Sequence, residues 1–124
     1  MRYMMLIYSR EDESSAPNDS VQVAAAHRTL MDDAAERGVF RAAEPLEPSA
    51  AATTLRIQDG TVLLTDGPFA ETKEQLAGYY ILDCKDLDEA LEWAARIPTA
   101  CLGGDGCVEV RPIRDMQRPQ VPNG

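Results

Sequence analysis

The chain contains one histidine, His27, and this residue is the first candidate for acid–base chemistry. Imidazole has a pKa of about 6.5, so histidine is the side chain best suited to exchange a proton at neutral pH. His27 lies between Ala24 and Leu30 on an apolar stripe that has the three- and four-residue spacing of one helical face. Two interpretations stay open: a core histidine satisfied by a hydrogen bond, or a general acid or base.

A second candidate group lies in the segment Asp66-Gly67-Pro68-Phe69-Ala70-Glu71-Thr72-Lys73-Glu74. A loop that mixes one aromatic ring, Phe69, with several ionisable side chains can line a pocket. Asp-Gly-Pro at the end of a strand is also ordinary turn chemistry. Lys73 either binds an anionic group of a ligand or pairs with a neighbouring carboxylate at the surface. Tyr80 belongs to a strand segment, where tyrosines either face a ligand or serve in packing.

Two β-α-β units joined by a hairpin must position these residues. Gly38 and Pro98 end the two helical segments, and Asp59-Gly60 predicts a type I′ turn between two strands. Asp86 and Glu89 have the spacing of a helix N-cap. The patterns predict strands at 3–8, 39–42, 53–57, 62–65, 79–84 and 108–111, helices at 20–37 and 86–97, and a long connector at 66–77.

This order predicts a ferredoxin-like α+β sandwich in which both helices cover one face of the sheet. The first strand, Tyr3 to Tyr8, is apolar at every position, so its second face also needs a cover. No third helix is available, and the simplest cover is the same face of a second copy in a two-fold homodimer. We expect one domain over residues 1–115 and a loosely held tail over residues 116–124.

The amino-acid composition argues against some classes of binding partner. The chain has 12 Lys and Arg against 21 Asp and Glu, and the net charge of −9 argues against binding nucleic acid or an anionic membrane. We expect no signal peptide and no membrane span, because the longest apolar run is far shorter than the roughly 20 residues that a span needs.

The three cysteines form no C-x-x-C pair, so we expect reduced thiols in a cytoplasmic protein and no metal site. Cys101 and Cys107 flank a glycine-rich loop, which leaves a disulfide between them as an alternative.

The segment from Asp66 to Glu74, followed by Gly78-Tyr79-Tyr80 and Leu87-Asp88-Glu89-Ala90, resembles the YCII-related family. It resembles in particular the branch that is named for an Asp-Gly-Pro-Phe motif. The likeness runs from Arg2 to about Pro112. It implies a ferredoxin-like fold that pairs into a dimeric α+β barrel, in agreement with the order of elements deduced above.

The resemblance also implies a site. In the branch with a shorter motif, a helix histidine and the aspartate of Asp-Pro-Phe are proposed as an active-site pair, and His27 and Asp66 fit these two positions. This chain differs by Gly67, which lies between the aspartate and the proline. Together with Phe69, Lys73 and Tyr80 as ligand-binding residues, the pair would transfer a proton on a small molecule.

The expected activity is therefore isomerase-like or hydrolase-like, on an unknown substrate and without a cofactor. The alternative is a non-catalytic dimeric module that binds a ligand or a protein. Members of this branch often lie beside sigma-factor genes, which suggests a regulatory role for such a module.

Overall fold

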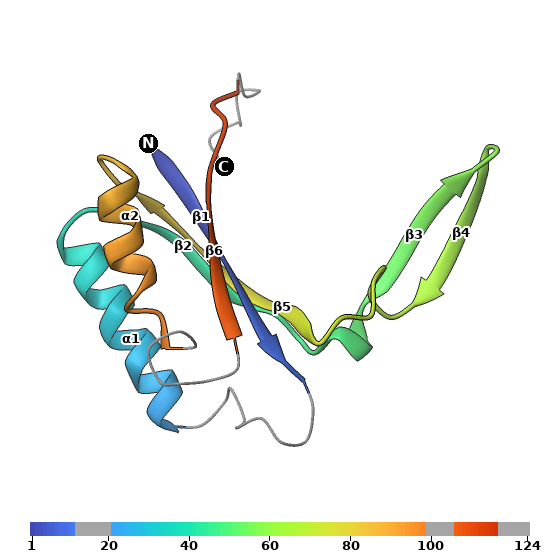
Figure 1. Cartoon of the computed structure of the whole chain (residues 1–124), viewed down its shortest axis with the longest axis horizontal. Coiled ribbons are helices and arrows are strands. Elements are labelled where there is room, and N and C mark those ends of the chain that lie inside the picture. Colours follow the sequence, from blue (N-terminus) through green and yellow to red (C-terminus); the bar gives the residue numbers. More distant parts are fainter. Residues whose placement is uncertain (12–20, 99–105, 117–124) are drawn as a thin grey trace, which may run out of the picture.

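The structure is a computed structural model that describes residues 1–11, 21–98 and 106–116. Within these described ranges, six strands, two α-helices and a short 3₁₀ turn follow one another (Figure 1). Their order is β1 (Arg2–Arg10), α1 (Val21–Glu36), β2 (Phe40–Pro45), η1 (Ser49–Ala51), β3 (Thr53–Gln58), β4 (Thr61–Asp66), β5 (Glu74–Asp83), α2 (Leu87–Ala94) and β6 (Gly106–Pro112). The expected α+β fold with β-α-β elements is confirmed.

Four strands form one antiparallel sheet in the order β2-β5-β1-β6. Strand β1 is central, so that Met5 faces Tyr80 of β5 on one side and Val110 of β6 on the other. Both helices lie against the same face of this sheet (Figure 1). The opposite face, which we call the helix-free face, has no helix over it among the described residues.

Helix α1 ends, and helix α2 begins, where the sequence predicts. Gly38 adopts a φ of 77°, and its N–H donates to the carbonyl of Ala35, which closes the end of α1. The Asp86 carboxylate accepts the backbone N–H of Glu89 at 2.9 Å and so caps α2. Helix α2 is shorter than predicted, because regular helix stops at Ala94 and a turn carries the chain on to the buried Ile97.

The core lies between the helices and the sheet. The largest side chains with almost no exposed surface are Met5, Leu82, Cys84 and Ile97. Burial alternates strictly along β1, because successive side chains point to opposite faces of a strand. Its odd-numbered residues are buried, whereas Met4, Leu6 and Tyr8 on the helix-free face are only half-buried. The described residues of a single chain therefore cover one face of β1 and leave the other open.

Strands β3 and β4 form a separate two-stranded hairpin. Asp59 and Gly60 have φ values of 51° and 77°, so the predicted type I′ turn is confirmed. The hairpin projects from the body of the protein on the side of the sheet opposite the helices (Figure 1). The predicted connector at 66–77 was too long, because β5 begins at Glu74 and its polar first residues pair with Arg10 and Ser9.

Gly78 marks a close approach between β2 and β5. A Cβ atom built on Gly78 would lie 2.8 Å from the carbonyl oxygen of Glu44. We predict that Gly78→Ala lowers the free energy of unfolding by about 1–3 kcal/mol, because two paired backbones must separate to accept the methyl group. Urea unfolding followed by circular dichroism measures the change, and a variant as stable as the wild type would contradict this account of the packing.

Candidate functional site

A pocket of about 410 Å³ lies between α1 and strands β2 and β5. Most of its lining is apolar, and the polar residues among those that line it are His27, Glu44, Tyr79 and Tyr80. We call it the His27 pocket. Its lining residues are Ile7, Ala24, His27, Met31, Ala43, Glu44, Pro45, Ala77, Gly78, Tyr79 and Tyr80.

His27 and Tyr80 meet in this pocket. The Nδ1 atom of His27 lies 2.6 Å from the hydroxyl oxygen of Tyr80, which is a short hydrogen bond. Helix α1 turns His27 toward the sheet because it shares a face with the buried Leu30 and Ala34. Tyr80 points toward the helices because it alternates in phase with Leu82 along β5. Helical and strand periodicity thus bring the two side chains together from residues 53 positions apart.

Burial sets the protonation state of the pair. It lowers the pKa of His27 below its usual 6.5, because a charged imidazolium loses hydration there. For the same reason, burial raises the pKa of Tyr80 to about 12. Both groups are therefore uncharged at neutral pH. A neutral imidazole bonded through one nitrogen keeps the other nitrogen for a ligand, as a donor or as an acceptor according to the tautomer.

The Asp-Gly-Pro-Phe segment lies at the base of the β3–β4 hairpin. Asp66 is the last residue of β4, and Gly67 follows with a φ of 100°, a conformation that favours glycine. The Gly67 N–H donates to the carbonyl of Ala52 at 2.7 Å, and its carbonyl accepts from the Thr54 hydroxyl at 2.8 Å. Gly67 thus turns the chain out of the hairpin and back toward β5.

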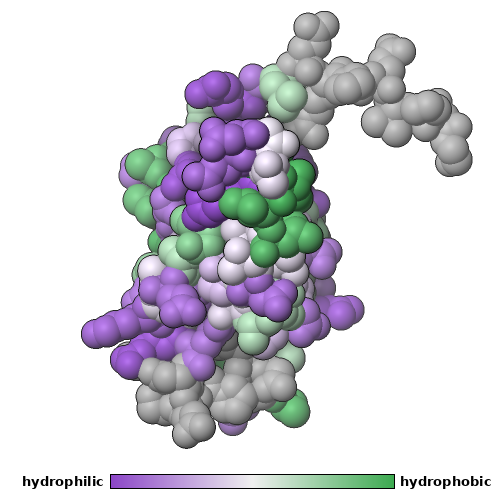
Figure 2. Space-filling model, turned by 90° about the vertical axis from the view of Figure 1, so that its right-hand side faces the viewer, coloured by the Kyte–Doolittle hydropathy of each residue, from purple (hydrophilic) through white to green (hydrophobic). Residues whose placement is uncertain are grey.

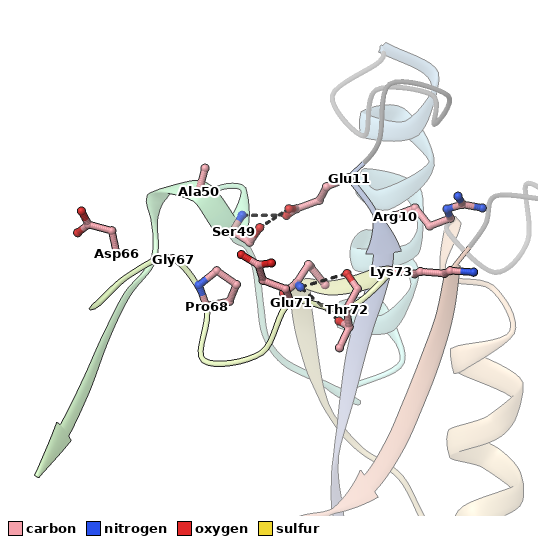
Figure 3. Close-up of a pocket in the computed structure, with 11 residues that line it drawn as sticks. Arg10, Glu11, Ser49, Ala50, Asp66, Gly67, Pro68, Glu71, Thr72 and Lys73 are labelled. Atoms are coloured by element: carbon pink, nitrogen blue, oxygen red, sulfur yellow. Dashed lines mark hydrogen bonds between the residues drawn. The ribbon is translucent and has the colours of Figure 1, made fainter. Parts of the chain in front are cut away.

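A second pocket, of about 610 Å³, lies beside this turn, and we call it the motif pocket. The Glu11 carboxylate spans it by accepting hydrogen bonds from the backbone N–H and the hydroxyl of Ser49. The Asp66 side chain points away from this contact, and the side chains of Arg10 and Lys73 lie on the other side of the pocket (Figure 3). Acidic and basic groups are therefore mixed around a largely open hollow.

The structure brings some of the predicted site residues together and keeps others apart. His27 and Tyr80 share the His27 pocket, whereas Asp66 and Lys73 line the motif pocket. In the chain described here, the hydrogen-bond partner of His27 is thus Tyr80. Phe69 lines neither pocket, and 79% of its surface is exposed.

Sequence reasoning missed Glu44 and Met31 in the wall of the His27 pocket. Met31 lies four residues after His27, so helical spacing could have indicated it. Glu44 gave no such signal, because its place depends on the pairing of β2 with β5. Among the described residues, no group of three or more His, Cys, Asp or Glu side chains is placed to hold a metal ion. Cys101, one half of the suggested disulfide, lies outside the described residues.

Comparison with known proteins identifies the family. The model of the YCII-related domain matches residues 1–117. The chain belongs to the YCII-related domain family. An uncharacterized protein of Rhizobium meliloti strain 1021 is similar to this YCII-related chain, with 37% identity over 125 residues that cover 99% of this chain and 100% of the relative. The resemblance seen in the sequence is confirmed at the level of the family.

Among solved structures, this YCII-related chain is similar to 5-chloro-2-hydroxyhydroquinone dehydrochlorinase from Burkholderia phenoliruptrix, solved in complex with 2,5-dihydroxybenzoquinone. The match covers 92% of this chain and 94% of the dehydrochlorinase, with a TM-score of 0.43 and 16% sequence identity. No helix in the described part of the YCII-related chain is long and apolar enough to cross a membrane.

The lowered pKa of His27 predicts how stability depends on pH. A histidine whose pKa is lower in the folded than in the unfolded chain binds its proton more weakly when folded, so acid favours unfolding. We expect the free energy of unfolding to fall as the pH drops below about 6.5 and to level off once the pH is below the folded pKa. Urea titrations at three pH values between 7.5 and 5.5 measure this slope.

The matched control for this measurement is His27→Gln, which removes the titrating group and keeps a polar side chain. Its slope should be close to zero in the same pH window. The carboxylates of Asp33, Asp83 and Glu109 have lowered pKa values, so the stability that they contribute is lost only as the pH falls below about 5, outside this window. An equally steep slope in His27→Gln would show that another group causes the dependence.

Proposed function

We propose that the His27 pocket is the active site of a small-molecule enzyme and that His27 transfers a proton there. The hydrogen bond between His27 and Tyr80 inside a mostly apolar hollow is the observation that carries this proposal. A general base works best when it is unprotonated at the working pH and is held in a fixed orientation. Burial supplies the first condition, and the Tyr80 hydroxyl supplies the second.

The chemistry follows from the two neutral groups. When Nδ1–H donates to the Tyr80 oxygen, the lone pair on Nε2 is available to take a proton from a substrate. The Tyr80 hydroxyl can in turn donate its own proton to a substrate oxygen, which stabilises charge as it develops. Returning the proton from Nε2 to another atom of the substrate gives an isomerisation. In a hydrolysis, Nε2 would take a proton from water, the hydroxide would add to the substrate as the bond to the leaving group breaks, and the imidazolium would give its proton to that group. Neither route requires a covalent intermediate.

In this proposal the side chain that orients His27 is Tyr80. The predicted pair of His27 and Asp66, and membership of the Asp-Gly-Pro-Phe branch, remain predictions. A ligand-binding role for Lys73 belongs to the motif pocket, which it lines. Phe69 would need a further surface to make such a contact, because it is exposed in the described chain.

We also propose that two copies of the chain pair through their helix-free faces into a dimeric α+β barrel. Met4 lies opposite Ile81 and Leu6 opposite Tyr79, so four large apolar or aromatic side chains gather at the centre of that face. All four are only half-buried in the single chain. Pairing the two faces would remove them from water, and a two-fold axis allows one patch to serve both copies.

Substrate screening tests the proposed activity. We suggest incubating the protein in D₂O with a panel of small carbonyl and enol compounds and following proton exchange by NMR. For any compound that reacts, His27→Gln should lower the rate by about 10²–10⁴-fold, the usual contribution of general acid–base catalysis. Tyr80→Phe should lower it less, because the imidazole remains in place without its orienting partner.

The same panel separates the enzyme from a binding module. A compound that binds in the His27 pocket with no reaction under any condition would favour the alternative of a non-catalytic, regulatory module. Turnover that is unchanged in His27→Gln would contradict the assignment of the active site. Lys73→Ala, in the motif pocket, is the matched control, and its turnover should stay close to that of the wild type.

A further inference from the structure

One face of the β3–β4 hairpin is apolar and uncovered. Leu55 pairs with Leu64 and Ile57 pairs with Val62, so these four side chains share a face. Between 56% and 70% of the surface of each residue is exposed. The opposite face carries Thr54 with Thr65, Arg56 with Leu63, and Gln58 with Thr61, and is mainly polar. The hairpin is therefore an amphipathic ribbon of the kind that normally packs against a core.

The described chain offers no surface of its own for this ribbon. The two strands pair only with each other, and a two-stranded hairpin alone is marginally stable in water. The hairpin also projects away from the helices, on the side of the helix-free face (Figure 1). Seen from that side, hydrophobic residues gather in patches bordered by hydrophilic ones (Figure 2). Two uncovered apolar surfaces of one chain thus lie on the same side of the molecule.

We propose that the β3–β4 hairpin is an arm that packs its apolar face against a second copy of this chain. The inference rests on the proposed pairing through the helix-free faces. A copy packed on the helix-free face of this chain would occupy the side into which the hairpin projects. Two-fold symmetry would give both copies the same arm contact. Specific interfaces bury about 800 Å² per partner, and the four side chains of the hairpin add to the four of the sheet toward that size.

The arm places the Asp-Gly-Pro-Phe segment in the same contact. Asp66 pairs with Thr53, and alternation along β4 puts its side chain on the same face as Val62 and Leu64. The carboxylate of Asp66 would therefore face the second copy, at the edge of the apolar contact. Phe69, three residues further on and highly exposed, would gain a partner from the same approach. The motif pocket of each copy would then be completed by its partner.

Neighbouring leucines on opposite faces of β4 provide the test. Leu64→Ser removes an apolar side chain from the proposed contact, whereas Leu63→Ser makes the same chemical change on the polar face. Both residues are exposed, so neither change disturbs the core, and circular dichroism checks the fold. Sedimentation velocity over a concentration series should show the dimer dissociation constant rising at least about tenfold for Leu64→Ser. For Leu63→Ser it should stay within about threefold of the wild type.

The outcomes separate the arm from the pairing on which it rests. A wild-type chain that is monomeric at all concentrations would overturn both. A wild-type dimer that Leu64→Ser does not weaken, but that Leu6→Ser on the helix-free face does, would overturn the arm alone. The activity proposed for His27 is tested separately by the substrate panel.

Photo-crosslinking then locates the contact. With Ile57→benzoylphenylalanine, the account predicts a product of twice the chain mass that joins position 57 to the body of the second copy, within residues 1–45 or 74–112. Arg56→benzoylphenylalanine, on the polar face, should give little of this product. A crosslink from hairpin to hairpin, or equal yields from the two positions, would overturn the proposed arm.

Discussion

In the part of the chain that the structure describes, two helices cover one face of a four-stranded sheet and leave the other uncovered, and both the candidate site and the proposed assembly depend on this constraint. The covered side holds the core, and beside it lies the pocket in which His27 meets Tyr80. The open side holds half-buried apolar side chains and the projecting hairpin. The His27 pocket and the proposed dimer contact thus lie on opposite faces of the same sheet, because alternate residues of a strand point in opposite directions. The Tyr80 side chain lies on the face that the helices cover, and the side chain of its neighbour Tyr79 lies on the helix-free face.

The same constraint explains why the pair in the pocket is neutral. His27 faces the sheet because helix α1 must bury Leu30 and Ala34, and burial then disfavours the charged form of the imidazole. The net charge of −9 does not reverse this effect, since burial is the cause that dominates at His27. A neutral histidine bonded to a neutral tyrosine is ready to exchange a proton. The mostly apolar lining suits a small ligand with few charged groups.

Much of the fold could be predicted from the sequence, because local signals specify it. The type I′ turn at Asp59-Gly60, the helix end at Gly38 and the cap at Asp86 each depend on a few adjacent residues. The start of β5 could not be predicted, because Glu74 and Gln75 are polar and join the sheet only through pairing with the extended end of β1. Local propensity carries no information about such a long-range pairing.

Only part of the candidate site could be predicted, because the contacts within it also join residues that lie far apart in the sequence. His27 and Tyr80 were both identified as candidates, because helical periodicity places His27 on an apolar stripe and a strand tyrosine such as Tyr80 can face a ligand or serve in packing. Their contact was not predicted, because it depends on how far along β5 the helix lies. The expected contact of His27 with Asp66 came from a motif with a different spacing. Here Gly67 turns the chain at the hairpin base, and Asp66 lines the motif pocket.

The most direct test of the central claim is an NMR pH titration of the His27 ring, which gives one clean curve because the chain has a single histidine. We expect a midpoint below about 6.5, because burial disfavours the charged ring. The midpoint should fall further in Tyr80→Phe, because the Nδ1–H loses an acceptor that stabilises the imidazolium more than the neutral ring, and it should be unchanged in Asp66→Asn. A midpoint above about 6.5 that falls in Asp66→Asn would contradict this expectation. That result would show that the carboxylate, and not the phenol, holds the imidazole.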